Sequence, residues 1–230
     1  METKPPTTPG AAGDIRAARF RDAIRPARPA DLPVLAAIHV TSGTPGLLSD
    51  LGAQFLERVY YRGVLESPLA SIYVLEMAQS PAGFVAFSPD SDRLFVQAMG
   101  RRWYLAGWLI LLAGLRRPRV MRDLLETVLS VRRHDLDRGI KAEVFSLQIH
   151  LRYQGLGLGL ILLERALARL QEQGCTEVKS RTLVSNVPVE RLHEYCGFRA
   201  AGTFRLHCRV WHMMVWHGTT VVGQESEGKG

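Results

Sequence analysis

Three glycines at alternate positions, Gly155, Gly157 and Gly159, stand directly before a long apolar stretch in HLRYQGLGLGLILLERAL. Leucines recur after them at helical spacing, which predicts a helix that begins at the glycines. The first turn of a helix has backbone N–H groups without a helical partner, and glycine lets an anion approach them closely. We therefore expect a pyrophosphate site here. The alternative is that the glycines serve only close packing where a strand meets a helix.

Two common phosphate loops do not fit this stretch. A P-loop needs Gly-Lys-Ser or Gly-Lys-Thr, which is absent, and a dinucleotide fingerprint needs GxGxxG with an acidic residue about twenty positions later. Here the spacing is GxGxG, and the stretch follows a late strand of the chain instead of the first one. The expected pyrophosphate site therefore belongs to neither class.

The stretch reads Gln154-x-x-Gly157-x-Gly159, which resembles the coenzyme A signature of the GNAT N-acetyltransferase superfamily. The preceding AEVFSLQIH and the later NVPVERLHEYCGF, which resembles the family's Asn…Leu-Tyr-Glu-x-x-Gly-Phe block, extend the likeness to about residues 23–97 and 140–217. It implies an α/β GNAT fold with a mixed, mostly antiparallel central sheet flanked by helices. It also implies acetyl-CoA as cosubstrate, whose thioester a primary amine attacks directly.

The resemblance also implies which residues hold the coenzyme. The loop from Gln154 to Gly159 binds the pyrophosphate through backbone N–H groups, and the end of the preceding strand pairs with the pantetheine arm through its main chain. The N–H of Ile149 polarises the thioester carbonyl, and Asn186 bonds to the arm. The cofactor-binding residues expected in this way are Gln148, Ile149, His150, Arg152, Gln154, Gly155, Leu156, Gly157, Leu158, Gly159 and Asn186.

The departing thiolate needs a proton or a hydrogen bond as it leaves. In the GNAT superfamily, which this stretch resembles, a Tyr four residues before the Gly of Gly-Phe supplies this proton. Here that position is His193, and Tyr195 follows two residues later. Two residues on a helix are about 200° apart, so the two side chains point different ways. We expect His193 to be the donor, with Tyr195 as the second candidate. The alternative is that His193 only packs in the helix and that no side chain protonates the thiolate.

The amine must lose a proton before it attacks, because a lysine-like amine has a pKa of about 10.4. Our candidate base is Glu143, which strand alternation places on one face with Phe145, Leu147 and Ile149. The rival acids are Asp50 and Glu57, in a region expected to flank the acceptor. A solvated Glu143 without a catalytic role is the alternative.

The chain reads as one domain with an α/β order of elements. We expect a disordered leader at 1–22, a single domain at 23–217, a helical insertion at 98–138 between the third and fourth strands, and a disordered tail at 218–230. The predicted strands lie at 23–25, twice within 71–89, at 142–150, at 177–184 and within 200–217. The predicted helices lie at 31–39, 47–67, twice within 98–138 around Pro118, from the glycines to Gly174, and at 187–197.

The inserted segment also concentrates the basic charge. The 230 residues carry a net charge of +7, and residues 101–138 hold nine arginines against four acidic residues. The apolar run YLAGWLILLAGL at 104–115 is shorter than the about 20 residues of a membrane span. The segment therefore suggests a lid, a dimer face or a membrane-surface contact, whereas a solvated arginine-rich face is the plainer interpretation.

The expected activity is a cytoplasmic N-acetyltransferase acting on a small amine such as an amino sugar or another metabolite. Three cysteines without paired spacing and no apolar leader favour the cytoplasm. We expect acetyl-CoA and an amine acceptor as partners, peripheral membrane contact or a homodimer as additional options, and neither a metal nor nucleic acid. Two alternatives stay open: a degenerate acyl-CoA-binding sensor or scaffold, and a membrane-surface acyltransferase acting through the insertion.

Overall fold

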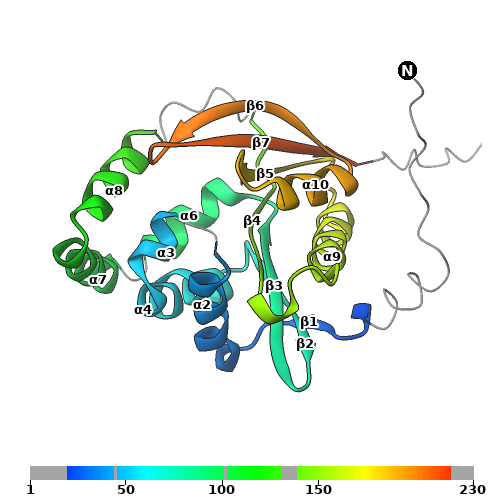
Figure 1. Cartoon of the computed structure of the whole chain (residues 1–230), viewed down its shortest axis with the longest axis horizontal. Coiled ribbons are helices and arrows are strands. Elements are labelled where there is room, and N and C mark those ends of the chain that lie inside the picture. Colours follow the sequence, from blue (N-terminus) through cyan, green and yellow to red (C-terminus); the bar gives the residue numbers. More distant parts are fainter. Residues whose placement is uncertain (1–19, 44–45, 101–102, 131–138, 219–230) are drawn as a thin grey trace, which may run out of the picture.

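The computed structural model describes residues 20–43, 46–100, 103–130 and 139–218 (Figure 1). Its described strands form one seven-stranded sheet in the order β1-β2-β3-β4-β5-β7-β6. All neighbours are antiparallel except β4 and β5, which are parallel. The strands are β1 (Ile24–Pro26), β2 (Ser71–Met77), β3 (Ser80–Ser88), β4 (Glu143–Ile149), β5 (Glu177–Leu183), β6 (Phe198–Leu206) and β7 (Arg209–His217).

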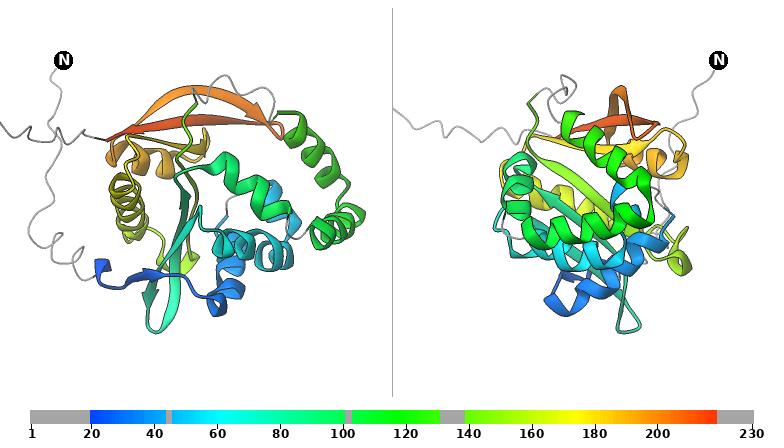
Figure 2. Two further views of the ribbon diagram at one scale, coloured as in Figure 1. Left: turned by 180° about the vertical axis from the view of Figure 1, so that it is seen from behind. Right: turned by 90° about the vertical axis from the view of Figure 1, so that its left-hand side faces the viewer.

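Helices cover both faces of this sheet (Figure 1, Figure 2). One face carries α2 (Leu32–Thr41), α3 (Leu47–Leu51), α4 (Ala53–Phe55), the π-helical η2 (Leu56–Tyr60), α5 (Tyr61–Glu66), α6 (Ser91–Gly100), α7 (Trp103–Arg116) and α8 (Pro118–Ser130). The other face carries α9 (Leu158–Glu172) and α10 (Val187–Tyr195). The short 3-10 turns η1 (Pro29–Asp31) and η4 (Leu151–Tyr153) complete the order.

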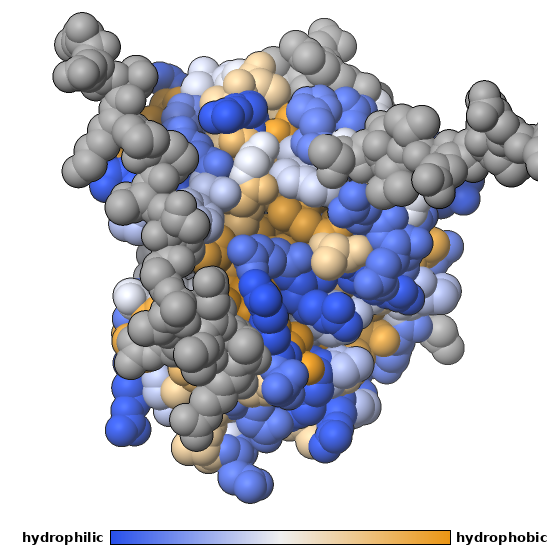
Figure 3. Space-filling model, turned by 90° about the vertical axis from the view of Figure 1, so that its right-hand side faces the viewer, coloured by the Kyte–Doolittle hydropathy of each residue, from blue (hydrophilic) through white to orange (hydrophobic). Residues whose placement is uncertain are grey.

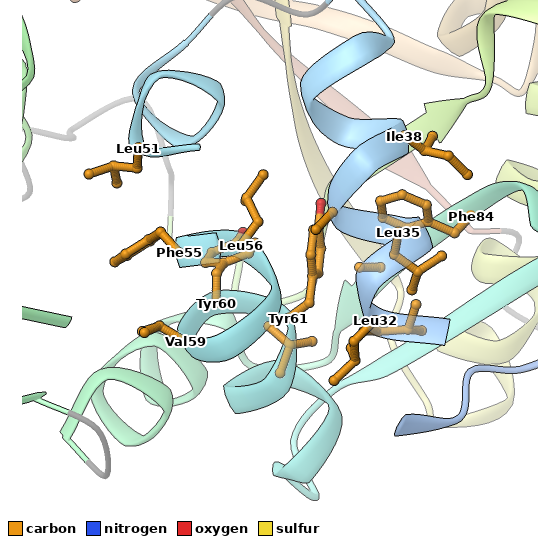
Figure 4. Packing of buried hydrophobic residues seen from close by; sticks show 14 of the residues in the cluster. Leu32, Leu35, Ile38, Leu51, Phe55, Leu56, Val59, Tyr60, Tyr61 and Phe84 are labelled. Atoms are coloured by element: carbon orange, nitrogen blue, oxygen red, sulfur yellow. The ribbon is translucent and has the colours of Figure 1, made fainter. Parts of the chain in front are cut away.

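The central strand β3 is apolar on both faces, as a strand covered on both sides must be. Its Phe84 and Ala86 belong to the core under α2 to α7, and its Val85 and Phe87 belong to the core under α9. In the first of these cores, Tyr61 lies between the helices and the sheet, close to Phe84 at a ring distance of 5.2 Å (Figure 4). Burial of these side chains holds the helices in place against β3.

The sheet, its flanking helices and the position of the insertion between the third and fourth strands confirm the predicted fold. The helix predicted at 47–67 is wrong in one respect, because it breaks at Gly52, whose φ of +87° ends α3. The helix expected to be capped by Asp31 forms, yet that carboxylate bonds to Arg25 and to the Arg28 N–H instead of capping it. The helix α6 precedes the two helices predicted in the insertion.

The predicted leader and tail lie mostly outside the described residues, which begin at Phe20 and end at Gly218. The same holds for 101–102 and 131–138 of the insertion. Its helices α7 and α8 meet around Pro118, as predicted.

Candidate active site

The parallel strands β4 and β5 share only a short stretch of pairing. Among the described residues their register consists of Glu143 with Lys179 and Val144 with Ser180, after which it stops. The rest of β4 is paired on one side with β3 and is open on the side toward β5. We call this opening the split: its vertex lies at Val144 and Ser180, and its mouth lies beyond the end of β4.

A β-bulge in β4 decides which main-chain groups face the split. Register runs from Ala86–Ser146 to Phe87–Val144, so Phe145 is an extra residue on β4. Beyond the bulge, the N–H of His150 donates to Ala82 O at 2.9 Å, on the β3 side. Because successive main-chain groups alternate between the two neighbours of a strand, the N–H groups of Leu147 and Ile149 point into the split.

This geometry corrects the predicted main-chain pairing with the pantetheine arm. Alternation turns Gln148 toward β3, and the two main-chain groups of His150 bond to Ala82 and to the Tyr153 N–H. Of the three residues expected to pair with the arm, Ile149 is therefore the one that faces the split. Leu147 was missed, because a bulge leaves no mark in the alternation of the sequence.

The glycine loop forms the mouth of the split. Gly155 and Gly157 have φ values of +78° and +77°, and a Cβ built on either would find no atom within 4 Å. Their backbone conformation therefore requires glycine, and open space lies over them. A Cβ on Gly159, in contrast, would lie 2.9 Å from Leu192 Cδ1, so this third glycine serves close packing against α10. The packing alternative thus holds for one of the three.

Gln154 and Arg152 have different parts in the loop. The Gln154 N–H donates to Leu151 O, and its side-chain Nε2 donates to Ser42 O at 3.2 Å and to Ile149 O at 3.1 Å. Gln154 therefore ties α2 to the end of β4 and has no main-chain donor for a phosphate. The Arg152 guanidinium lies exposed, 5.9 Å from the centre of the Tyr153 ring, and can reach an anion at the mouth.

The backbone at the start of α9 supplies the donors. Gly157 is the N-cap of α9, and Leu160 N–H returns to its carbonyl at 3.1 Å. The N–H groups of Leu158 and Gly159, in the first turn, have no acceptor within the helix. Together with Leu156 they line the predicted pyrophosphate site. Figure 3 shows the side of the molecule on which α9 lies, where apolar residues stand between hydrophilic ones.

His193 lies at the vertex but is enclosed. Its side chain is 2% exposed, with Nδ1 at 2.8 Å from Val189 O and Nε2 at 2.9 Å from Ser180 Oγ. Burial lowers the pKa of His193, although the Val189 carbonyl opposes the shift. A carbonyl only accepts, so Nδ1 carries the proton of the neutral ring and Nε2 accepts from the Ser180 hydroxyl. The predicted direct donation from His193 to a thiolate therefore has no free N–H to use.

Tyr195 and Asn186 occupy the two ends of α10. Tyr195 is 60% exposed, so it points away from buried His193, as the helical geometry predicts. Asn186 precedes the helix as its N-cap, and its side chain makes no capping hydrogen bond. Its amide is thus not used to cap α10.

Glu143 lies at the vertex, on the face of the sheet opposite His193. It is 2% exposed, and its Oε1 accepts from Arg181 Nη2 at 2.5 Å and from Nε at 3.1 Å. Its Oε2 is buried without a hydrogen-bond partner in the described part of the chain. The buried Tyr60 is close by: burial, and then the Glu143 charge, raise the pKa of Tyr60.

The predicted alternation around Glu143 is wrong beyond the bulge. Phe145 and Ser146 both face the helices α2 to α5, as their contacts with Tyr60 and Tyr61 show. Leu147 and Ile149 therefore face α9 instead of sharing the face of Glu143. Of the rival acids, Asp50 forms an exposed ion pair with Arg117 at 2.8 Å, at the insertion.

A chain of buried polar groups beside Glu143 was not predicted. Ser146 Oγ lies 2.9 Å from the Tyr61 hydroxyl, which lies 2.5 Å from His39 Nδ1. Burial lowers the pKa of His39 to about 4, so the ring is neutral at pH 7. These residues come from β4, α5 and α2, and no sequence spacing relates them.

The sequence matches the model of the acetyltransferase (GNAT) family over residues 47–198. No curated protein matches the chain. A GNAT-family acetyltransferase from Desulfovibrio desulfuricans is similar in structure, with a TM-score of 0.55 and 11% identity, over 85% of this chain and 98% of that one. The PaiA N-acetyltransferase from Thermoplasma acidophilum, solved with coenzyme A, has a TM-score of 0.56 and 12% identity over the same shares.

A third structure, SsHAT, has a TM-score of 0.57 and 20% identity, over 85% of this chain and 97% of that chain. At these identities the structural likeness establishes the fold and nothing finer. The family match spans more than half of the chain and includes β4, the glycine loop and α10. The chain therefore belongs to the acetyltransferase (GNAT) family.

Proposed function

We propose that this protein transfers the acetyl group of acetyl-CoA to the primary amine of a small molecule, such as an amino sugar or another metabolite. Membership of the acetyltransferase family supports acetyl-CoA as the donor. The observation that supports an amine as the acceptor is Glu143 Oε2, a buried carboxylate oxygen without a hydrogen-bond partner among the described residues. An ammonium group is a donor of the right charge for it. The free thiols Cys175, Cys196 and Cys208 favour a cytoplasmic location.

The coenzyme would lie along the split with its pyrophosphate at the mouth. The N–H groups from Gly155 to Gly159 would bind the phosphates, with Arg152 beside them, and Asn186 would bond to the arm. Ile149 is five residues from the vertex at Val144, about 17 Å in an extended strand. The thioester lies at the far end of the arm from the pyrophosphate, so we assign its carbonyl to the N–H of Leu147, which is deeper, and the arm to Ile149.

The leaving thiolate would meet the vertex from the side of α10. Ser180 Oγ is the polar group there, and His193 Nε2 holds it at 2.9 Å. We therefore assign the hydrogen bond to the sulfur to Ser180, whose hydroxyl proton would turn from His193 Nε2 to the developing thiolate, with His193 as the residue that positions the hydroxyl. Exposed Tyr195 has no part in this arrangement.

The amine would enter from the face of Glu143. The carboxylate would bind the ammonium through Oε2 and take its proton, after which the neutral amine attacks the carbonyl carbon. The tetrahedral intermediate then expels the thiolate of coenzyme A while its nitrogen gives up a second proton, which the thiolate takes up, and the amide product keeps the acetyl group. The bond from the acetyl carbon to sulfur breaks and a bond to nitrogen forms, and no oxidant or reductant is involved.

The test is thiol release from acetyl-CoA across a panel of amino sugars, polyamines and amino acids, with mass spectrometry of the acetylated product. We expect one class of primary amine to give product at rates well above hydrolysis. A second candidate function, an acyl-CoA sensor without transfer, is favoured by the histidine at the family's tyrosine position. Tight binding of acetyl-CoA without thiol release for any amine would support the sensor and overturn the transferase.

A further inference from the structure

The inserted helix α7 is apolar on its outer side as well as its inner side. Tyr104, Trp108, Leu111 and Leu115 recur at helical spacing and are between 50% and 74% exposed. The opposite side of α7, including Leu109, packs against the core under α2 to α5. A helix that is hydrophobic all round is normally covered on every side. The exposed apolar outer side of α7 therefore indicates a binding surface.

The neighbouring helix α8 extends this surface. Met121 and Leu125 are 45% and 60% exposed. A Cβ on Gly114 would lie 2.8 Å from Met121 Sδ, so α8 packs directly against α7. We define the insertion face as Tyr104, Trp108, Leu111, Leu115, Met121 and Leu125. The two helices form an outer layer of the molecule (Figure 2, right).

Positive charges predominate around the insertion face. The helix α7 has no acidic residue, and the acids of α8 turn inward, since Asp123 is buried and Glu126 accepts from the His207 N–H at 3.0 Å. Arg117, Arg119 and Arg122 are exposed, with Arg117 paired to Asp50 at 2.8 Å and Arg122 to Asp123 at 3.1 Å. In the described part of α7 and α8, the outward charges are therefore arginines. The positive charge of these arginines complements an anionic partner.

The insertion face is also held in place by the fold. His207 lies in the turn between β6 and β7, and its Nε2 is 2.8 Å from Thr127 Oγ1 on α8. Together with the bond from its N–H to Glu126, this contact fixes α8 to the end of the sheet. The face is thus presented by a rigid support.

We propose that the insertion face binds the surface of a membrane with anionic headgroups, with α7 lying parallel to it. Tryptophan, tyrosine and leucine on one side and arginines around them are the composition of helices that lie in the interface. None of the described helices has the length and apolarity to cross a bilayer. The 14 residues of α7 span about 21 Å, short of the about 30 Å of the hydrocarbon core.

A second copy of the chain is the rival occupant, and the charges disfavour it. In a two-fold dimer the same face meets itself, so arginines would approach arginines, and the nearby acids Asp50 and Asp123 are already paired within their own chain. Anionic lipids supply the missing charge, and each arginine near such a surface adds to the attraction. The lipid surface is therefore the occupant that both the apolar and the charged groups fit.

The experiment is vesicle flotation with the full chain. We expect partition onto vesicles of phosphatidylglycerol and phosphatidylcholine, weaker partition onto pure phosphatidylcholine, and release by high salt. The double variant Trp108→Glu, Leu115→Glu should lower the partition coefficient at least about tenfold, because it places charges in the apolar layer. Val34→Glu, at an exposed apolar position of α2, is the matched control and should partition like the wild type.

The other outcomes overturn the proposal. Absence of partition onto either vesicle excludes a lipid surface, and a dimer that the same double variant dissociates in analytical ultracentrifugation assigns the face to a second copy. Acetyl transfer to a soluble amine should be the same in the wild type, the double variant and the control. Absence of acetyl transfer by the wild-type protein would therefore count against the proposed function and would leave the lipid result unaffected.

Discussion

At the mouth of the split the expected ligand groups are backbone N–H donors of a loop with open space above it, whereas at the vertex they are buried side chains held by other side chains. Gly155 and Gly157 meet nothing that would obstruct a phosphate. Glu143, Ser180 and His193 are each enclosed and bonded within the fold. In the proposed function, binding of the coenzyme would thus depend on local backbone shape, and the transfer chemistry would depend on contacts between elements.

The largest effect is expected at the mouth. Gly157→Glu puts a negative side chain at the proposed pyrophosphate site and strains a positive φ. Loss of two or more charge-assisted hydrogen bonds should weaken acetyl-CoA binding at least about 100-fold in calorimetry. Gly174→Glu is the matched control, because Gly174 has a φ of +83° and open space but stands at the other end of α9. Equal loss in both variants would attribute the effect to strain and refute the phosphate site.

The next effect is expected at the vertex on the side of the amine. Glu143→Gln keeps the size and one acceptor for Arg181 but removes the base. The kcat/KM for the amine should fall about 100-fold, the low end for general base catalysis, with acetyl-CoA affinity unchanged. The rate of the variant should also keep rising with pH, as the free amine becomes more abundant.

The control for this prediction is Glu177→Gln, at an exposed glutamate whose Oε1 lies 3.2 Å from His217 Nδ1. It should leave the kcat/KM unchanged. A Glu143→Gln enzyme with full activity and a lowered melting temperature would assign the carboxylate to a structural ion pair with Arg181.

A smaller effect is expected on the thiolate side of the vertex. Ser180→Ala should lower kcat about tenfold, the worth of one hydrogen bond to a developing charge, with little change in acetyl-CoA affinity. If His193 acts through Ser180, then His193→Ala should have a similar effect and the double variant no larger one. Tyr195→Phe should be silent. Additive losses, or an inactive Tyr195→Phe enzyme, would move the donor role elsewhere.

The smallest effect concerns the stability of the protein and tests whether water is excluded from the buried polar groups around His39. The pKa of His39 is about 4 in the folded protein, below the about 6.5 of an unfolded chain. As the pH falls from 7 to 5.5, the unfolded state takes up a proton that the folded state does not, so folding loses stability. The loss from this group should be about 1 kcal/mol.

Denaturant unfolding at both pH values measures this loss. His39→Gln can still bond to Tyr61 but does not titrate, so its stability should fall by about 1 kcal/mol less than that of the wild type. The same fall in both proteins would show that His39 is hydrated and that its burial does not control its charge.

The difference between mouth and vertex also explains what the sequence predicts. The glycine loop and the helix after it were predictable, because a turn, its positive φ values and its N–H groups all lie within a few adjacent residues. Glu143 and Arg181 are 38 residues apart and meet only because β4 and β5 pair. Simple alternation failed after Phe145, since the bulge is set by pairing with β3 and not by the residue types.

The same limit applies to the helices around the acceptor face. The break at Gly52 depends on one glycine adopting a positive φ, and many glycines within helices do not. Ser146, Tyr61 and His39 form their chain through three elements, so each residue alone reads as an ordinary core or surface position. The exposed side of α7 was predicted only as an apolar run, because exposure depends on which neighbours the fold supplies.

The contact between Gly159 and Leu192 has a kinetic consequence. Leu192 precedes His193, so the first turn of α9, at the proposed pyrophosphate site, packs directly on α10, whose His193 bonds to Ser180. If the loop adjusts as the coenzyme docks, this contact would pass the adjustment on to α10. The vertex should therefore reach its working arrangement only after acetyl-CoA is in place. Initial-rate patterns should then show compulsory-order addition, with acetyl-CoA bound before the amine and coenzyme A released last.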